Sequence, residues 1–254
     1  MAVNRFNYFS ANNNFKYCGS SQFKDFLKCP AKAMAMLKGE WVREESSSLL
    51  IGSYVDAWFE GTIEQFKAEH PSIFKKDGTL KSEYVNANAI IERVSQDELF
   101  MKYMAGKKQV IKTGTIEGVP FKIKMDSYHK GKAIVDLKVI KDFEPFWNAE
   151  KGIKEDFIRH WGYDYQAAIY QAIEGHKLPV YICAVTKEST PDFNVIHIPQ
   201  PWIDSAMEVI KNEIGIIQAI KNGEIEAKRC ECCDYCKATK KLTRVISADE
   251  LAYD

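Results

Sequence analysis

Apolar side chains recur at helical spacing through the N-terminal part of the chain. Residues 1–18 are rich in Asn and aromatic side chains and are expected to form an irregular arm. Residues 62–80 are expected to be rich in loops. The spacing predicts helices from Ser20 to Cys29-Pro30, over Ala31–Lys38, over Ser48–Phe59 and over Ser82–Met104.

The pattern changes to short runs rich in β-branched residues near residue 110. Turns at Glu117-Gly118 and Lys130-Gly131 divide the first three runs into a predicted antiparallel meander. A cysteine-rich segment and a polar tail close the chain. The predicted strands and helices of this part are Val110–Ile116, Val119–Asp126, Ala133–Ile140, a helix over Asp164–Glu174, the strands Val180–Thr186 and Asp192–Ile198, and a helix over Ile203–Asn222.

Composition narrows the class of protein. A chain of 254 residues can bury the core of one α/β domain with extensions. Lys plus Arg number 35, as do Asp plus Glu, so the net charge counts mildly against a passive DNA-binding protein. The N-terminus lacks the apolar core of a signal peptide, and no apolar run approaches the length of a membrane span. We therefore expect a soluble, cytoplasmic protein without membrane contact.

Three charged side chains are set among the apolar strands of the predicted meander. Asp126 ends one strand, and Asp136 and Lys138 share a face of the next because residues two apart on a strand point the same way. On an exposed hairpin such charges would be solvated, but the apolar neighbours indicate a partly buried group. Two carboxylates and the Leu137 carbonyl can hold Mg²⁺ or Mn²⁺, and Lys138 can orient a water or offset developing charge. This is the chemistry of phosphodiester hydrolysis.

Four cysteines crowd into one short segment, at Cys230, Cys232, Cys233 and Cys236. In a reducing compartment such spacing favours a metal site over disulfides. Cys230, Cys233 and Cys236 are the predicted ligands, with Cys232 to spare. Zinc, an iron–sulfur cluster and unliganded thiols remain alternatives, and either metal site needs a fourth ligand.

Three further segments stand in a fixed order around the Asp126–Lys138 hairpin. They are Leu27-Lys28-Cys29-Pro30, Gly52-Ser53-Tyr54-Val55-Asp56 and Gln166-Ala167-Ala168-Ile169-Tyr170. The ordered set resembles the PD-(D/E)xK nuclease superfamily, in the branch that holds lambda exonuclease, RecB nuclease domains and RecE (exodeoxyribonuclease VIII). The chain departs from that pattern at Met125, where the family name has Pro, and at Asp56, where the branch usually has His.

The resemblance implies a restriction-endonuclease-like fold of the α/β (α+β) class, with a mixed central sheet, an antiparallel meander and flanking helices. It implies one domain over 1–254, with an N-terminal helical segment at about 20–60 and a cysteine-rich C-terminal segment at 228–240.

The resemblance also implies roles for individual residues. Asp56 would join Asp126 and Asp136 as a metal ligand, unless it only caps or pairs locally. Gln166 and Tyr170, four apart on one helical face, would contact DNA or a metal-bound water, unless they are ordinary core and surface residues. Some RecB-like relatives hold a [4Fe–4S] cluster with one cysteine before the nuclease core and three after it; the corresponding set here is Cys29, Cys230, Cys233 and Cys236.

The implied function is a metal-dependent DNA exonuclease that acts on duplex ends during phage or prophage recombination or repair. It would work in a bacterial or phage-infected cell, beside a single-strand annealing protein and as a possible homo-oligomer. Two alternatives remain: a structure-specific endonuclease with the same site, and a non-catalytic nucleic-acid-binding protein with a degenerate nuclease fold.

Overall fold

A five-stranded sheet forms the centre of the protein in a computed structural model that describes residues 2–42, 46–149 and 152–251. Met1 of the predicted arm and the last three residues of the predicted tail lie outside these ranges. The strand order is β1-β2-β3-β6-β7, with β3 and β6 parallel and every other pair antiparallel. The strands are β1 (Lys107–Ile116), β2 (Val119–His129), β3 (Ala133–Ile140), β6 (Val180–Thr186) and β7 (Phe193–Ile198).

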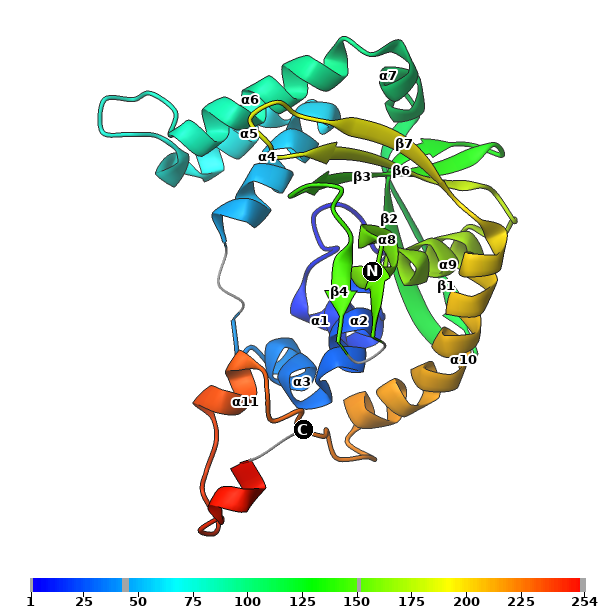
Figure 1. The fold of residues 1–254 in the computed structure, drawn as a ribbon. Helices are drawn as coiled ribbons and strands as arrows, with labels where there is room; N and C mark the ends of the chain where they lie inside the picture. Colours follow the sequence, from blue (N-terminus) through cyan, green and yellow to red (C-terminus); the bar gives the residue numbers. More distant parts are fainter. Residues whose placement is uncertain (1, 43–45, 150–151, 252–254) are drawn as a thin grey trace.

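Helices cover both faces of this sheet (Figure 1). One face carries the helices that precede the meander, apart from the first three: α4 (Ser47–Glu60), α5 (Ile63–Glu69), α6 (Ser82–Ser95) and α7 (Glu98–Met104). The other face carries α2 (Ser20–Lys28), α3 (Pro30–Lys38), α8 (Phe157–His160), α9 (Tyr163–Glu174) and α10 (Gln200–Asn222).

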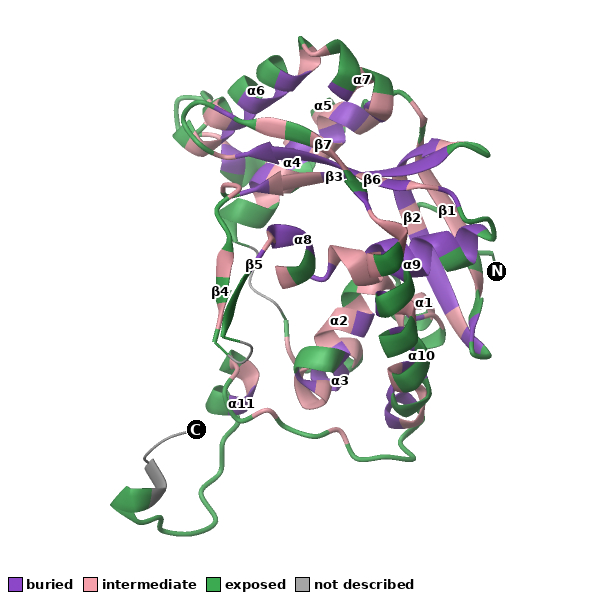
Figure 2. Ribbon diagram, turned by 45° about the vertical axis from the view of Figure 1, so that its right-hand side comes forward, coloured by how far each residue is buried: buried purple, intermediate pink, exposed green. Residues whose placement is uncertain are grey.

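Each face of the sheet has its own hydrophobic core, and buried residues line the sheet on both sides (Figure 2). Along β3 the side chains alternate between the cores, with Val135 and Leu137 packed towards α4 and α7, and Ile134 and Ile140 towards α2 and α9. The predicted mixed sheet with flanking helices is therefore confirmed. No helix in the described ranges is both long and apolar enough to cross a membrane.

Several predicted elements need correction. The helix expected over Ser82–Met104 is two helices, because Asp97 accepts a hydrogen bond from the Phe100 N–H and caps α7 as a new helix. The excursion over 62–80 contains α5 and the short 3-10 helix η1 (Pro71–Ile73). The arm contains the helix α1 (Ala11–Lys16).

Further short elements were not predicted. β4 (Phe146–Asn148) and β5 (Ile153–Glu155) form a separate two-stranded sheet, and each strand is too short to give a period in sequence. The helix α11 (Asp234–Ala238) and the 3-10 helix η2 (Ala248–Leu251) lie in the C-terminal segment, for which no helix was predicted.

Candidate active site

The alternation of side chains along β2 is interrupted at Asp126. Met125 packs into the core beside α9, whereas the Ser127 hydroxyl donates to the Tyr103 carbonyl of α7 on the opposite face. Tyr128 then lies in the same core as Met125. Strict alternation would place Ser127 on the α9 side of the sheet and Tyr128 on the α7 side, but the structure has them the other way round. β2 also continues to His129, so Asp126 does not end its strand as predicted. It sits at a bend within the strand.

The neighbouring strand bends at the same level. Gln109 of β1 lies opposite Asp126 and has a φ of 51°, which is uncommon for any residue other than glycine. Its side-chain amide donates to Asp126 Oδ1 over 3.4 Å, and its own Oε1 is buried without a hydrogen-bond partner. On the other side, paired residues of β2 and β3 begin only at Ser127 and Val135, and the Leu137 N–H donates to Asp126 Oδ2 over 3.0 Å. The carboxylate thus fills the gap between diverging strands.

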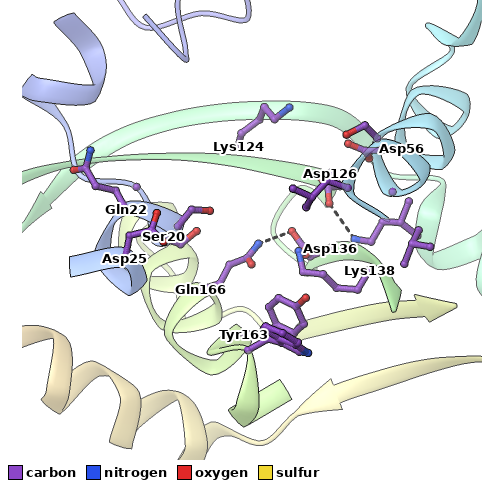
Figure 3. A pocket seen from close by; sticks show the side chains of 18 of the residues that line it. Ser20, Gln22, Asp25, Asp56, Lys124, Asp126, Asp136, Lys138, Tyr163 and Gln166 are labelled. Carbon is purple, nitrogen blue, oxygen red and sulfur yellow. Dashed lines mark hydrogen bonds and ion pairs between the residues drawn. The ribbon is translucent and has the colours of Figure 1, made fainter. Parts of the chain in front are cut away.

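Asp136 and Lys138 project together from β3, as predicted. Their side chains form an ion pair, and both are largely buried. Gln166 of α9 donates from Nε2 to Asp136 Oδ1 over 2.6 Å, so one helix fixes the orientation of the carboxylate (Figure 3). The Lys138 ammonium also lies 4.7 Å from the ring centre of Tyr163. Burial disfavours the charged ammonium, but the nearby Asp136 carboxylate outweighs burial and raises the pKa of Lys138.

Asp56 of α4 faces this group from the other side of the strand bend, close to Asp126 (Figure 3). Its Oδ1 is buried and has no hydrogen-bond partner. Burial raises the pKa of Asp56 to about 7, and the carboxylates of Glu60 and Asp136 add to the rise, while Lys124 opposes it. Glu60 lies one turn after Asp56 and was not predicted as part of the site.

The carboxylates of this group repel one another. Burial raises the pKa of Asp126 well above its ordinary range, and the neighbouring Asp136 and Asp56 raise it further. Lys138 compensates only part of this charge. A divalent cation is the group that buried, clustered carboxylates with an unpaired oxygen fit, so Asp56, Asp126 and Asp136 form a chemically suitable metal-binding set.

A cavity of about 960 Å³ opens over these carboxylates. Its walls come from the arm, from α2 and α3, from the start of α4, and from β2, β3 and α9. Gly52 lines it, and a Cβ at that position would meet no atom within 4 Å. The glycine of the predicted Gly-Ser motif therefore leaves open space on the cavity side of α4.

Tyr170 lies one turn after Gln166 but makes a different contact. Its ring is buried and its hydroxyl donates over 2.8 Å to the carbonyl of Lys124, two residues before Asp126. The contact fixes β2 just before the bend. Gln166 and Tyr170 thus share one helical face, as predicted, and both support the carboxylate-bearing strands.

The structure also brings together the four cysteines that were grouped in sequence analysis. The sulfur atoms of Cys29, Cys230, Cys233 and Cys236 all lie within 4.8 Å of one another. The Sγ–Sγ distance is 3.6 Å from Cys29 to Cys236 and 3.9 Å from Cys230 to Cys236. Cys232 is exposed and is not one of these four, although its Sγ lies 3.6 Å from that of Cys230. Cys29 is also the N-cap of α3, which places it beside the C-terminal segment.

Sequence reasoning missed two residues that adjoin the clustered carboxylates, Glu60 and Gln109. Glu60 carried a weak signal, since it stands four residues after Asp56 and thus on the same helical face. Gln109 carried none, because a positive φ at a residue other than glycine leaves no mark in the sequence.

Comparison with known proteins gives four results. The family model for "PDDEXK-like domain of unknown function (DUF3799)" matches residues 19–239. The chain is 43% identical to a protein from Eubacterium rectale named "Putative exonuclease", whose crystal structure superposes with a TM-score of 0.95 over 99% of this chain and 98% of that chain. A structure of SSO0001 covers 78% of this chain and 85% of that chain at 12% identity, but its TM-score of 0.31 carries no argument. No curated protein matches the chain.

Proposed function

The chain belongs to the family of PDDEXK-like domains of unknown function (DUF3799), and from this premise we propose that it is a metal-dependent deoxyribonuclease. Membership confirms the predicted resemblance, and the solved relative from Eubacterium rectale confirms the predicted fold. The observation that carries the proposed activity is the meeting of Asp56, Asp126 and Asp136 beside Lys138 at the wall of one cavity.

Asp56, Asp126 and Asp136 are the proposed ligands of Mg²⁺ or Mn²⁺, with the Leu137 carbonyl. In a strand the N–H and C=O of one residue point to the same side, and the Leu137 N–H points at Asp126. The Leu137 carbonyl therefore also faces the gap between β2 and β3. When bound, the metal would polarise the scissile phosphate and lower the pKa of a water.

The remaining residues position and compensate charge. Lys138 keeps its proton, because Asp136 raises its pKa, so its ammonium would stabilise negative charge on the phosphate rather than act as a base. Gln166 holds Asp136 in one orientation through its 2.6 Å hydrogen bond. Tyr170 from α9 and Gln109 from β1 hold the bent part of β2. A site so pre-arranged needs little reorganisation when charge develops.

The finer proposal is an exonuclease that resects duplex ends for phage or prophage recombination, with a single-strand annealing protein as partner and possible assembly into a homo-oligomer. What supports exonuclease action is the name of the Eubacterium rectale relative. The recombination role, the partner and the cytoplasmic location rest on the family resemblance alone.

One assay tests the activity and its mode together. A linear duplex, a closed circle and a single strand are incubated with the protein in Mg²⁺ or Mn²⁺, with Asp136→Ala as the inactive variant. Progressive loss of the linear duplex alone supports an exonuclease, and cutting of the closed circle replaces this proposal with an endonuclease. If no substrate is cut and the parent matches Asp136→Ala, the chain is a binding protein with a nuclease fold.

We propose a second metal centre at Cys29, Cys230, Cys233 and Cys236. A single zinc ion with bonds of about 2.3 Å to four thiolates separates the sulfurs by roughly 3.8 Å. The two Sγ–Sγ distances given above lie close to this value. A four-iron cluster places each thiolate on a different iron and spreads the sulfurs farther, so the compact group favours zinc. Metal analysis of the purified protein, with an absorption spectrum under anaerobic conditions, decides between zinc, an iron–sulfur chromophore and no metal.

A further inference from the structure

An exposed aromatic ring stands at the edge of the candidate active-site cavity. Phe9 belongs to the N-terminal arm, lines the cavity and is 71% exposed. Phe6 belongs to the same turn and is 84% exposed, but it does not line the cavity. Phe9 is therefore an exposed ring that a ligand in the cavity could reach, whereas Phe6 is an exposed ring outside it.

The arm that presents Phe9 is firmly attached to the sheet. Tyr8 is buried, and the Lys122 ammonium of β2 donates to the Tyr8 carbonyl and to Asn14 Oδ1. The Asn14 side chain in turn donates to the Phe9 carbonyl over 3.1 Å. The backbone on both sides of the ring is thereby fixed. Phe9 is therefore exposed on a segment whose backbone is held in place by hydrogen bonds.

Lys124 connects this ring to the metal-binding carboxylates. Its ammonium lies 5.6 Å from the ring centre of Phe9, and it is close enough to Asp56 to oppose the rise in the pKa of that carboxyl. Its carbonyl is held by the Tyr170 hydroxyl. Lys124 points along the cavity wall above Asp126 (Figure 3). One exposed ring, one ammonium and the carboxylates thus follow one another along a single wall.

We propose that this wall binds a single-stranded end of DNA, with an unpaired base stacked on Phe9 and the adjoining phosphate on Lys124. The inference rests on the proposed function and adds a substrate class to it. A flat ring in water offers its face to a base that has left its duplex partner, whereas a paired base already stacks on its neighbours. The ammonium supplies the charge complementarity that the chain as a whole, with net charge +0, does not provide.

Binding measurements on the full chain test this proposal. An oligonucleotide with 2-aminopurine near one end is titrated in Ca²⁺ instead of Mg²⁺, and a gel verifies that it stays intact. Stacking on Phe9 quenches the fluorescence. Phe9→Ala is expected to weaken single-strand binding roughly 5- to 150-fold and to abolish the quenching. Phe9→Trp keeps both, and Phe6→Ala, the matched exposed ring outside the cavity, changes neither. Binding of a blunt duplex is little affected by any of the three.

The outcomes separate this inference from the nuclease proposal. If Phe9→Ala binds the single strand like the parent, or weakens single strand and blunt duplex equally, the stacking role is wrong even where the parent cuts DNA. If Phe9-dependent quenching is seen but no substrate is cut in Mg²⁺ or Mn²⁺, the stacking role stands and the catalytic proposal fails. Circular dichroism of each variant verifies that the fold is intact.

Discussion

At the scale of single residues, Asp56 shows how one substitution alters a site. The family branch usually has a neutral or cationic His at this position, and here a third carboxylate joins Asp126 and Asp136. Without a cation, burial and the neighbouring carboxylates favour the protonated acid, and Oδ1 has no partner to compensate. The carboxylates therefore repel one another when no cation is bound, and a bound cation would relieve this repulsion.

The pH dependence of stability follows from this residue. The pKa of Asp56 is about 7 in the folded chain and near its ordinary 3.8 in the unfolded chain, so the folded state binds more protons between these values. Without added Mg²⁺, stability should fall as pH rises from about 4 to 7, and Asp56 alone should contribute up to about 1.4 kcal/mol per pH unit to this fall. The raised pKa of Asp126 adds a further fall of the same sign. Urea unfolding at several pH values measures this slope.

Asp56→Asn should flatten the slope and stabilise the metal-free protein above pH 7, whereas Glu92→Gln on the exposed side of α6 should not. Saturating Mg²⁺ should stabilise the parent more at pH 8 than at pH 6, because the ligands must lose their protons to bind it. Equal slopes in the parent and in Asp56→Asn would contradict the assignment.

At the scale of elements, Gly106 and Gly52 differ in the space that surrounds them. In Gly106, which precedes β1, an added Cβ would lie 2.7 Å from Ser127 Oγ and 2.9 Å from backbone atoms of Tyr128. In Gly52, inside α4, an added Cβ would meet nothing and would project beside the cavity. The first glycine permits a close approach of β1 to β2, and the second leaves open space at the cavity wall.

Alanine at these two positions should therefore act differently. Gly52→Ala should raise stability by up to about 1 kcal/mol, because alanine favours the helix, yet weaken DNA binding. Gly106→Ala should lower stability, because backbone atoms cannot easily move away. Thermal unfolding and oligonucleotide binding measure the two effects. A Gly52→Ala variant that binds DNA like the parent would show that the open side of α4 is not used.

The elements themselves were largely predictable from local patterns. β3 and β6 have the predicted limits, because an apolar run between turns leaves little choice. The helix expected over Ser82–Met104 was wrong, since helical spacing continues across the break that Asp97 caps. The bend at Asp126 was not predictable, because it depends on contacts between strands and on the backbone of Gln109. The sequence identified the charged residues, and tertiary packing decides how they meet.

At the scale of the whole molecule, the cysteine group joins distant parts of the chain. Cys29 starts α3, and its partners lie about 200 residues later, in the segment that also places Asp234 in an ion pair with Lys32. The α3 helix contributes to the cavity wall. A metal here would close a very long loop and hold that wall in place.

Removal of this link should lower stability without touching the carboxylates. Cys233→Ser should lose the bound metal and lower the melting temperature by several degrees, whereas Cys232→Ser, outside the sulfur group, should do neither. A strong chelator should reproduce the effect in the parent and leave Cys233→Ser unchanged. Identical melting temperatures for the two serine variants would contradict a metal centre at these cysteines.

The hydrogen bond from the Leu137 N–H to Asp126 makes this amide proton a built-in sensor of the proposed metal site. Elsewhere in a sheet such a proton is protected by a neighbouring backbone carbonyl, but here a side chain that is also a proposed metal ligand protects it. Its NMR shift and its exchange rate with solvent should therefore change when Mg²⁺ binds. Asp126→Ala should speed its exchange, while the amide of Val185, inside the parallel pair of β3 and β6, stays slow. One backbone proton would then report metal occupancy without any substrate.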